Sequence, residues 1–496
     1  MNKEILLNGR KVEIAEYKEQ IIDEYDNNPF IQALPYIKSK EEIIKLLNSK
    51  IKFTKKEADL DSNIRIHIIQ KIYKVFQPLP IHLRVWNMID TLLRQGYVSR
   101  NPYNPEYIRH INETGNNIIN KNYTFEVKSS FTATASCGLI IGFSGMGKTT
   151  IVNKVLENIP QVIAHNNYNG QTFNNIQVTW IKLEAPHNSS LKALTLQFFM
   201  KVDEILGTNN MRRYAVKNLS VDAMLPLLGQ LANNIGLGLL VIDELQHLNK
   251  NSSQVMNYFV TLMNTFGVPI LLIGTPACYD MLQQEMRIAR RVTGSGEIIW
   301  NNMKNDDEFK LFLKGIWRYQ YLKKYTKLND EIINIIYLKT QGISDLVVKL
   351  FVKVQQICIE TGKEEITVDL INKVWNKEFK MITPMIESIK SNNKTKMFKY
   401  EDIKILAEES LDNKLIPKKK AELNENNDNN NNNNSSNGNS TQYKSIKKKI
   451  KVDNLDDNDI RKIVIVGLKN SKSTYESLKE NGVIKNIYDI IGGKND

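Results

Sequence analysis

The chain has 496 residues, of which 42% are hydrophobic and 24% are charged, and its formal net charge is +13 at pH 7. This length exceeds what one hydrophobic core usually organises, so two to four folding units are expected, and the composition excludes disordered and fibrous classes. The basic balance favours a polyanionic partner such as nucleic acid, although an abundance of Lys and Asn alone gives the same charge.

Cysteine spacing and hydropathy exclude two further classes of protein. Cys137, Cys278 and Cys358 are far apart and form no CxxC pair, so we expect no disulfide framework or zinc site. Residues 1–13 contain no apolar run of signal-peptide length, and the most apolar segments are only as long as strands. These features predict a cytoplasmic protein with no membrane attachment and with its cysteines in the core.

The first 130 residues are predicted to form a mostly helical N-terminal region. Apolar residues recur at helical spacing over 43–47, and again on one stripe from Pro80 to Tyr97. Gly96 marks the end of this second helix.

From about Cys137 the pattern changes to short apolar strands that alternate with helices. Such alternation predicts a parallel sheet covered on both faces, which we assign to residues 131–300. The expected strands cover 137–143, 177–185, 237–244 and 268–275, and the expected helices begin at Lys148 or cover 191–206 and 254–266.

Helical periodicity returns in residues 301–423, which are predicted to form a lid. Residues 424–440 are almost entirely Asn, Ser and other polar residues and predict a flexible linker. A tail follows over 441–496 and begins with a cluster of lysines.

The sequence GFSGMGKT at Gly142–Thr149 matches the phosphate-loop pattern G-x-x-x-x-G-K-[ST] in full. Its glycines let backbone N–H groups turn toward phosphate oxygens, and the following helix directs its positive end at them. Lys148 supplies a positive charge to the β- and γ-phosphates, and Thr149 offers a hydroxyl to Mg²⁺. The expected ATP-binding residues are Gly142, Phe143, Ser144, Gly145, Met146, Gly147, Lys148, Thr149 and Thr150.

Two carboxylates, Asp243 and Glu244, end a strongly apolar strand downstream of this loop. The carboxyl end of a parallel strand lies beside the phosphates, so Asp243 is expected to hold Mg²⁺ together with Thr149. Glu244 is expected to act as the general base that activates water. Without the phosphate loop, this pair would be interpreted as an ordinary surface or capping pair.

Three further residues are candidates for the catalytic step. Thr275 ends the next predicted strand, where a hydroxyl can contact the γ-phosphate or the attacking water, unless it is an ordinary strand-end residue. Arg290 and Arg291 precede a Gly-rich turn, and one of them is expected to reach the γ-phosphate bound by a neighbouring subunit. The alternative is that these arginines form a basic cluster that faces solvent or DNA. An arginine that completes the ATP site of a neighbouring subunit requires assembly into a ring or a helical filament.

These features predict an α/β protein with an AAA+ P-loop NTPase core. In this interpretation a parallel sheet flanked by helices is combined with a helical N-terminal region, a helical lid and a flexible C-terminal tail. The predicted activity is ATP hydrolysis with Mg²⁺ as cofactor.

Segments inside and outside the ATP site resemble TnsC, the AAA+ regulator of Tn-seven-type cut-and-paste transposons. The resemblance covers most of the chain except the Asn-rich linker. Besides the phosphate loop, it is carried by NPFIQALP at 28–35, WIKLEAPHNSSLKALTLQFF at 180–199, DELQHL at 243–248, GISDLVVKLFV at 342–352 and parts of the tail.

Membership of this family implies binding to double-stranded DNA in the ATP state and assembly into a homo-oligomeric ring or filament. It also implies that the protein connects a TnsD-like target selector to a transposase and licenses insertion. The resemblance assigns contact with a TnsA-like subunit to residues 441–496, expects a TnsB-like subunit as another partner, and assigns target-selector or DNA contacts to residues 1–130.

DNA-contact residues are harder to assign from sequence. A ring around DNA should present Lys or Arg to phosphates, and Lys192 and Lys201 are candidates, with surface positions on a buried helix as the alternative. Many AAA+ lids carry an arginine where this chain has Asp345, so no lid residue is predicted to sense nucleotide. A replication-type AAA+ helicase loader or initiator, and a signalling NTPase that binds no DNA, remain alternatives.

Overall fold

The computed structural model describes residues 4–7, 10–123, 130–215, 219–278, 282 and 294–391. All of them belong to one compact unit, which comprises residues 1–411. The predicted linker at 424–440, the predicted tail at 441–496, and Arg290 and Arg291 lie outside the described residues.

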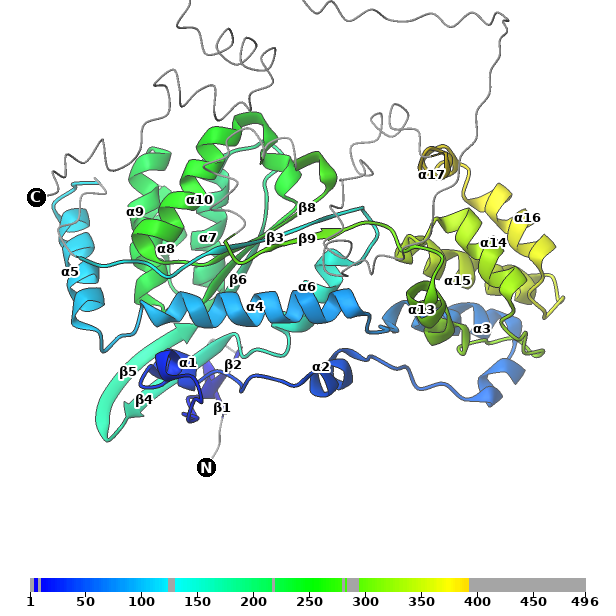
Figure 1. Cartoon of the computed structure of the whole chain (residues 1–496), viewed down its shortest axis with the longest axis horizontal. Coiled ribbons are helices and arrows are strands. Elements are labelled where there is room, and N and C mark those ends of the chain that lie inside the picture. Colours follow the sequence, from blue (N-terminus) through cyan, green and yellow to red (C-terminus); the bar gives the residue numbers. More distant parts are fainter. Residues whose placement is uncertain are drawn as a thin grey trace, which may run out of the picture. The chain divides into compact units, whose positions relative to one another are not determined.

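Among the described residues, five parallel strands form the core sheet (Figure 1). Every residue of the three middle strands is buried, as expected for a parallel sheet covered on both faces. The strand order is β6-β7-β8-β3-β9, with β3 at Cys137–Gly142, β6 at Trp180–Glu184, β7 at Leu239–Asp243, β8 at Ile270–Gly274 and β9 at Glu297–Trp300.

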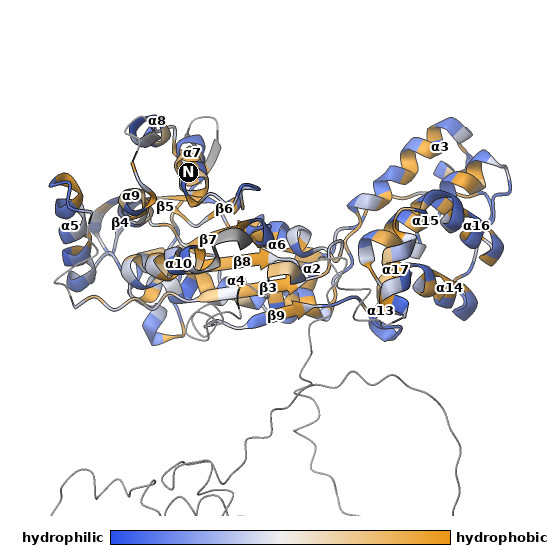
Figure 2. Ribbon diagram, turned by 90° about the horizontal axis from the view of Figure 1, so that it is seen from above, coloured by the Kyte–Doolittle hydropathy of each residue, from blue (hydrophilic) through white to orange (hydrophobic). Residues whose placement is uncertain are grey.

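Two apolar cores lie on opposite faces of this sheet, because successive strand residues point to opposite sides. Ile140 and Val241 belong to one core, whereas Leu139 and Ile242 belong to the other. Figure 2 shows the strands as predominantly hydrophobic between these layers. The first core includes α4 (Pro80–Val98) and α6 (Lys148–Leu156), and the second includes α7 (Leu191–Leu206), α9 (Val221–Asn234) and α10 (Ser252–Phe266). The predicted AAA+ P-loop fold is therefore confirmed.

The N-terminal region is less purely helical than the sequence predicts. Two of its segments are strands, β1 (Glu4–Leu7) and β2 (Arg10–Ile14), which join the hairpin of β4 (Val162–Tyr168) and β5 (Gln171–Val178). Within the described chain these four form a second sheet of order β1-β2-β4-β5. Besides α4, the helices of the N-terminal region are α1 (Pro29–Gln32), α2 (Lys40–Leu47), α3 (Ser62–Ile68) and α5 (Pro105–Ile119). The 3-10 segments of this region are η1 (Asp23–Tyr25), η2 (Lys55–Asp59) and η3 (Ile69–Lys74).

The single strand predicted over 177–185 is wrong, because it divides at Thr179 between β5 and β6. The Thr179 backbone N–H donates to the Gln161 carbonyl at 3.0 Å, and its hydroxyl donates to the Pro160 carbonyl. These bonds hold the chain where it passes from the second sheet into the core sheet. A near-alternating apolar pattern continues through both strands, so periodicity alone does not reveal the break.

The lid is helical as predicted, as far as the described chain extends. Trp317 and Phe351 stack at 4.9 Å in its core. Arg65 of α3 is buried against it and forms a 2.7 Å ion pair with Glu364, so part of the N-terminal region packs on the lid. The lid helices are α13 (Asp307–Trp317), α14 (Asp330–Thr340), α15 (Ser344–Glu360), α16 (Val368–Glu378) and α17 (Thr383–Lys390).

The remaining elements of the described chain are α8 (Asn210–Ala215), η4 (Leu245–Asn251) and η5 (Pro276–Cys278). All three cysteines are buried and free, which confirms their prediction as core residues. No helix in the described ranges is long and apolar enough to cross a bilayer.

Candidate nucleotide-binding site

The phosphate loop connects the end of β3 to the start of α6. Gly142 lies so close to β9 that an added Cβ would sit 2.2 Å from the Trp300 carbonyl oxygen, so only glycine fits. Gly147 caps α6 with φ of 96°, a left-handed conformation that favours glycine. The loop therefore presents backbone to its ligand and leads directly into a helix N-terminus, an arrangement suited to phosphate oxygens.

Lys148 is buried, with only 9% of its surface exposed. Its ammonium donates to the carbonyl oxygens of Gly142 at 2.7 Å and Phe143 at 2.9 Å, which holds the charge over the loop. A positive charge held in this place can meet the outer phosphates of a triphosphate.

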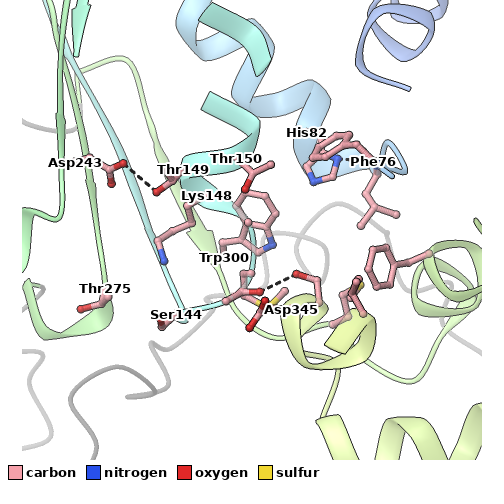
Figure 3. Close-up of a pocket in the computed structure, with 18 of the residues that line it drawn as sticks. Phe76, His82, Ser144, Lys148, Thr149, Thr150, Asp243, Thr275, Trp300 and Asp345 are labelled. Carbon is pink, nitrogen blue, oxygen red and sulfur yellow. Dashed lines mark hydrogen bonds between the residues drawn. The ribbon is translucent and has the colours of Figure 1, made fainter. Parts of the chain in front are cut away.

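The two predicted magnesium ligands contact each other. The Thr149 hydroxyl donates to Asp243 Oδ2 at 2.9 Å (Figure 3). Asp243 Oδ1 accepts the backbone N–H of Glu244 at 3.0 Å, so the orientation of the carboxylate is fixed. A hydroxyl and a carboxylate are the oxygen ligands that Mg²⁺ uses beside a bound nucleotide, so these residues fit the ion.

Asp243 also has a partner that the sequence analysis missed. Lys182 of β6 forms an ion pair with Asp243 Oδ2 at 3.0 Å and donates to Asn153 Oδ1 of α6 at 2.8 Å. The available signal was a lysine between the apolar residues Ile181 and Leu183 of a strand in the core sheet.

Glu244 and Thr275 are connected through Gln246. The Gln246 amide N–H donates to Glu244 Oε2, and Gln246 Oε1 accepts the backbone N–H of Thr275 at 3.1 Å. Glu244 itself has φ of 58°, an uncommon conformation for a residue with a side chain. Gln246 thus ties the candidate base to the end of the neighbouring strand β8.

Thr275 lies on the wall of the cavity with 6% of its surface exposed. Its hydroxyl has no hydrogen-bond partner among the described residues. A buried hydroxyl without a partner is costly, and a γ-phosphate or a water molecule in the cavity would satisfy it.

The lid contacts the phosphate loop through residues that the sequence analysis left out. Both the Ser344 hydroxyl, at 2.8 Å, and the Asp345 backbone N–H, at 3.0 Å, donate to the Gly145 carbonyl. The Asp345 carboxylate pairs with Lys349 at 2.6 Å. The start of α15 is therefore joined to the backbone of the phosphate loop by two hydrogen bonds.

A cavity of about 710 Å³ extends from the phosphate loop to an apolar end. Figure 3 shows Lys148, Thr149 and Asp243 on one side, Phe76 and His82 on the other, and Trp300 between them. The apolar and aromatic lining of this end suits a nucleotide base. Its lining residues include Phe76, Leu79, His82, Trp300, Met303, Phe312 and Val348.

His82 is the polar group of this apolar end. Burial lowers the pKa of His82 to about 3, so its imidazole is neutral at pH 7. Nδ1 accepts the backbone N–H of Leu79 at 2.9 Å, which places the ring proton on Nε2. The ring centroid lies 4.7 Å from that of Phe76 and 5.4 Å from that of Trp300.

The two candidate DNA lysines lie on α7, away from this cavity. Lys201 pairs with Glu204 at 2.8 Å. Lys192 is nine residues earlier, so at about 100° per residue the two side chains project from opposite sides of the helix. A single DNA surface on α7 would therefore contact one of them and not both.

Comparisons with known proteins agree with this fold. Residues 132–282, less than a third of the chain, match the family described as "AAA domain". No curated protein matches the chain.

The chain is also similar, at low identity, to solved structures, three of which follow. The ORC2 protein of Aeropyrum pernix, in ADPNP–ADP complexes, is 12% identical with a TM-score of 0.32, and the match covers 54% of this chain and 66% of that one. The ORC1 protein of the same organism, in complex with DNA, is 14% identical with a TM-score of 0.32, covering 57% and 69%. Domain III of the replication initiation protein DnaA from Thermotoga maritima is 14% identical with a TM-score of 0.29, covering 56% and 99%.

Likenesses of this size carry no weight for function, and the chain spans only about two-thirds of the two ORC proteins. The family match, the parallel sheet and the phosphate loop define the class: this chain carries an AAA+ ATPase domain. The particular biological role is a separate question.

Proposed function

We propose that this protein is an ATP-dependent, DNA-binding regulator of DNA transposition. It oligomerises on target DNA and links target selection to activation of a transposase. The observation that carries the ATPase half is the Thr149–Asp243 contact at 2.9 Å beside the Lys148 loop, because it pairs two magnesium ligands at a phosphate site.

In this proposal Lys148 and the loop amides bind the phosphates, while Thr149 and Asp243 hold Mg²⁺. The metal would neutralise charge on the β- and γ-phosphates. Glu244 accepts a proton from the attacking water, and the Thr275 hydroxyl donates to the water or the γ-phosphate. Arg290 or Arg291 of a neighbouring subunit completes the site, which makes hydrolysis depend on assembly.

The transposition half rests on the TnsC-like segments, several of which contact or contribute to elements of the site. Asn28, from the segment 28–35, donates to the Tyr97 carbonyl at the far end of α4. Ser344, from the segment 342–352, donates to Gly145 in the phosphate loop. The Ser344 contact supports the proposal because it connects one family-like segment directly to the phosphate loop.

The domain roles follow the same resemblance. Residues 1–130 contact DNA or a TnsD-like selector, 131–300 form the ATPase core, 301–423 the lid, and 441–496 bind a TnsA-like transposase subunit beyond the linker 424–440. A TnsB-like subunit is a further partner. Lys192 or Lys201, but not both on one surface, contacts DNA phosphates.

The test combines Lys148→Ala with duplex DNA and a slowly hydrolysed ATP analogue. Wild-type protein should form rings or filaments on DNA by electron microscopy, with log affinity falling linearly with log salt concentration. Lys148→Ala should form none, whereas Lys324→Ala, which removes an exposed lysine of the lid, should behave as wild type. ATP-dependent DNA assembly by Lys148→Ala would reject the nucleotide half.

The partner is tested separately with the full chain. Purified transposase subunits should co-precipitate with the protein, and a chain lacking residues 441–496 should lose the TnsA-like subunit. Selective capture of a replicative helicase instead would favour a replication-type loader over a transposition regulator.

A further inference from the structure

Lys182 is a charged residue in contact with the site to which the proposed chemistry assigns no role. It lies on β6 opposite Val241 in the parallel register, and its side chain reaches across to Asp243, two residues further along β7. Only 17% of the Lys182 side chain and 5% of the Asp243 side chain are exposed. The pair is therefore shielded from water, and removing either charge alone would be costly.

Asn153 holds the ammonium in place from a third element. Its side-chain oxygen accepts from Lys182 Nζ at 2.8 Å, while the same Nζ lies 3.0 Å from Asp243 Oδ2. Asn153 is exposed on α6, the helix that also carries Thr149. The ammonium is thus positioned between the phosphate-loop helix and the strand that bears the metal ligand.

The position of the Lys182 ammonium limits the acceptor sites that Asp243 has left for a metal ion. Oδ1 accepts the Glu244 N–H, and Oδ2 accepts the Thr149 hydroxyl and faces the Lys182 ammonium. A carboxylate offers about two acceptor sites on each oxygen. Both sites on Oδ2 are therefore occupied by the chain itself.

Magnesium keeps several of its water molecules, and these waters need acceptors. An ion or a metal-bound water that contacts both Asp243 and Thr149 lies on the Oδ2 side of the carboxylate, because Oδ2 is the oxygen beside the Thr149 hydroxyl. There it competes with the Lys182 ammonium for an acceptor site on Oδ2. Thr149 can donate its proton to Asp243 and still bind metal through its oxygen lone pairs. Lys182 cannot coordinate a cation, because an ammonium has donors and no acceptor.

We infer that in the metal-free state the Lys182 ammonium occupies an acceptor site on the Asp243 carboxylate, and that Mg²⁺ must displace this ammonium when it binds. This inference rests on the proposed function. Lys182 acts as a positioning residue: it keeps the carboxylate oriented while the site is empty, and it raises the magnesium concentration that nucleotide binding requires.

The experiment titrates Mg²⁺ against binding of a fluorescent, slowly hydrolysed ATP analogue to the full-length chain. Lys182→Met removes the ammonium and keeps an apolar side chain of similar length. Asn153→Ala removes only the bond that holds the ammonium and changes no charge. Lys324→Met breaks an exposed ion pair with Glu365 and is the control for loss of one positive charge.

Lys182→Met should lower the half-saturating Mg²⁺ concentration by roughly threefold to tenfold, the range expected when a partly shielded competing ion pair is lost. Asn153→Ala should lower it by about twofold to threefold, and Lys324→Met should leave it unchanged. In EDTA without nucleotide, Lys182→Met should melt at a lower temperature than Lys324→Met, because the shielded Asp243 carboxylate loses its cation.

An unchanged or increased Mg²⁺ requirement in Lys182→Met would overturn the inference. So would an unchanged requirement in Asn153→Ala, since Lys182 would then act only as a distant charge. Failure of the wild type to bind the analogue at any Mg²⁺ concentration is a different result, and it would reject the proposed function itself.

Discussion

The two ends of the nucleotide cavity are built in different ways. The phosphate end comes mostly from one contiguous motif, Gly142–Thr150, and its polar atoms are held by short hydrogen bonds. The base end brings together apolar residues from the N-terminal region, β9 and the lid, such as Phe76, Trp300 and Val348. In the proposed function, recognition of the phosphates would therefore depend on backbone geometry set by one motif, whereas recognition of the base would depend on tertiary packing.

Glu244→Gln should show the largest effect and concerns the phosphate end alone. The amide cannot accept the proton of the attacking water, so kcat should fall by roughly two orders of magnitude or more. Nucleotide affinity should change less than about twofold, and the ATP-bound assembly should persist. Single-turnover hydrolysis and equilibrium binding measure the two quantities. Turnover at the wild-type rate would remove Glu244 from the role of base.

Phe76→Ala tests the base end. Loss of an aromatic stacking partner should weaken ATP binding by about tenfold, with kcat little changed. Affinity for inorganic tripolyphosphate, which has no base, should match that of the wild type. A parallel loss for both ligands would show that Phe76 supports the whole fold of the cavity and would break the division into two ends.

Gln246→Ala separates positioning from binding within the phosphate end. Without the amide, the Glu244 carboxylate loses the hydrogen bond from Gln246 that connects it to the end of β8. Because the candidate base is then less well positioned, kcat should fall by roughly tenfold while KM for ATP stays the same. Gln246→Asn, which keeps an amide on a shorter side chain, should recover part of the rate. An effect on KM alone would assign Gln246 to substrate binding instead.

His82 gives a smaller, pH-dependent effect. Its pKa is lowered by burial to about 3 in the folded chain, against about 6.5 when unfolded, so the unfolded chain takes up the proton first. The stability it contributes is therefore present above pH 6.5 and is lost as pH falls toward 3. Between pH 6.5 and 5 the loss should be about 2 kcal/mol. Chemical denaturation should show a shallower acid dependence for His82→Asn, and equal slopes would contradict this account.

The sequence was a good guide where residues adjacent in the chain do the chemistry. The glycine pattern predicted the strand, loop and helix around Lys148, and the buried strand ending in Asp243 was placed correctly beside them. The roles of Glu244 and Thr275 remain predictions, since contacts show position and not activity. Local periodicity also could not reveal that Thr179 divides two sheets.

Other parts of the site were not visible because they depend on contacts between distant segments. Phe76 and Trp300 are ordinary apolar residues until the fold brings them together. Lys182 is a single lysine in a strand, and its pairing with Asp243 depends on which strands are neighbours. Ser344 contacts Gly145, about 200 positions earlier in the chain, and no short-range pattern encodes that distance.

Helix α4 connects remote parts of the molecule as a rigid rod. It has 19 residues, from Pro80 to Val98, and is about 28 Å long, with His82 in its first turn beside the apolar end of the cavity and Tyr97 in its last turn. There Tyr97 donates to the Gly236 carbonyl at 2.7 Å, and its own carbonyl accepts from Asn28 at 2.7 Å. An α-helix resists compression along its axis, so a shift of its first turn by an arriving base would be felt at the segment around Asn28. Ligand occupancy would thereby reach a buried segment of the N-terminal region that does not line the cavity.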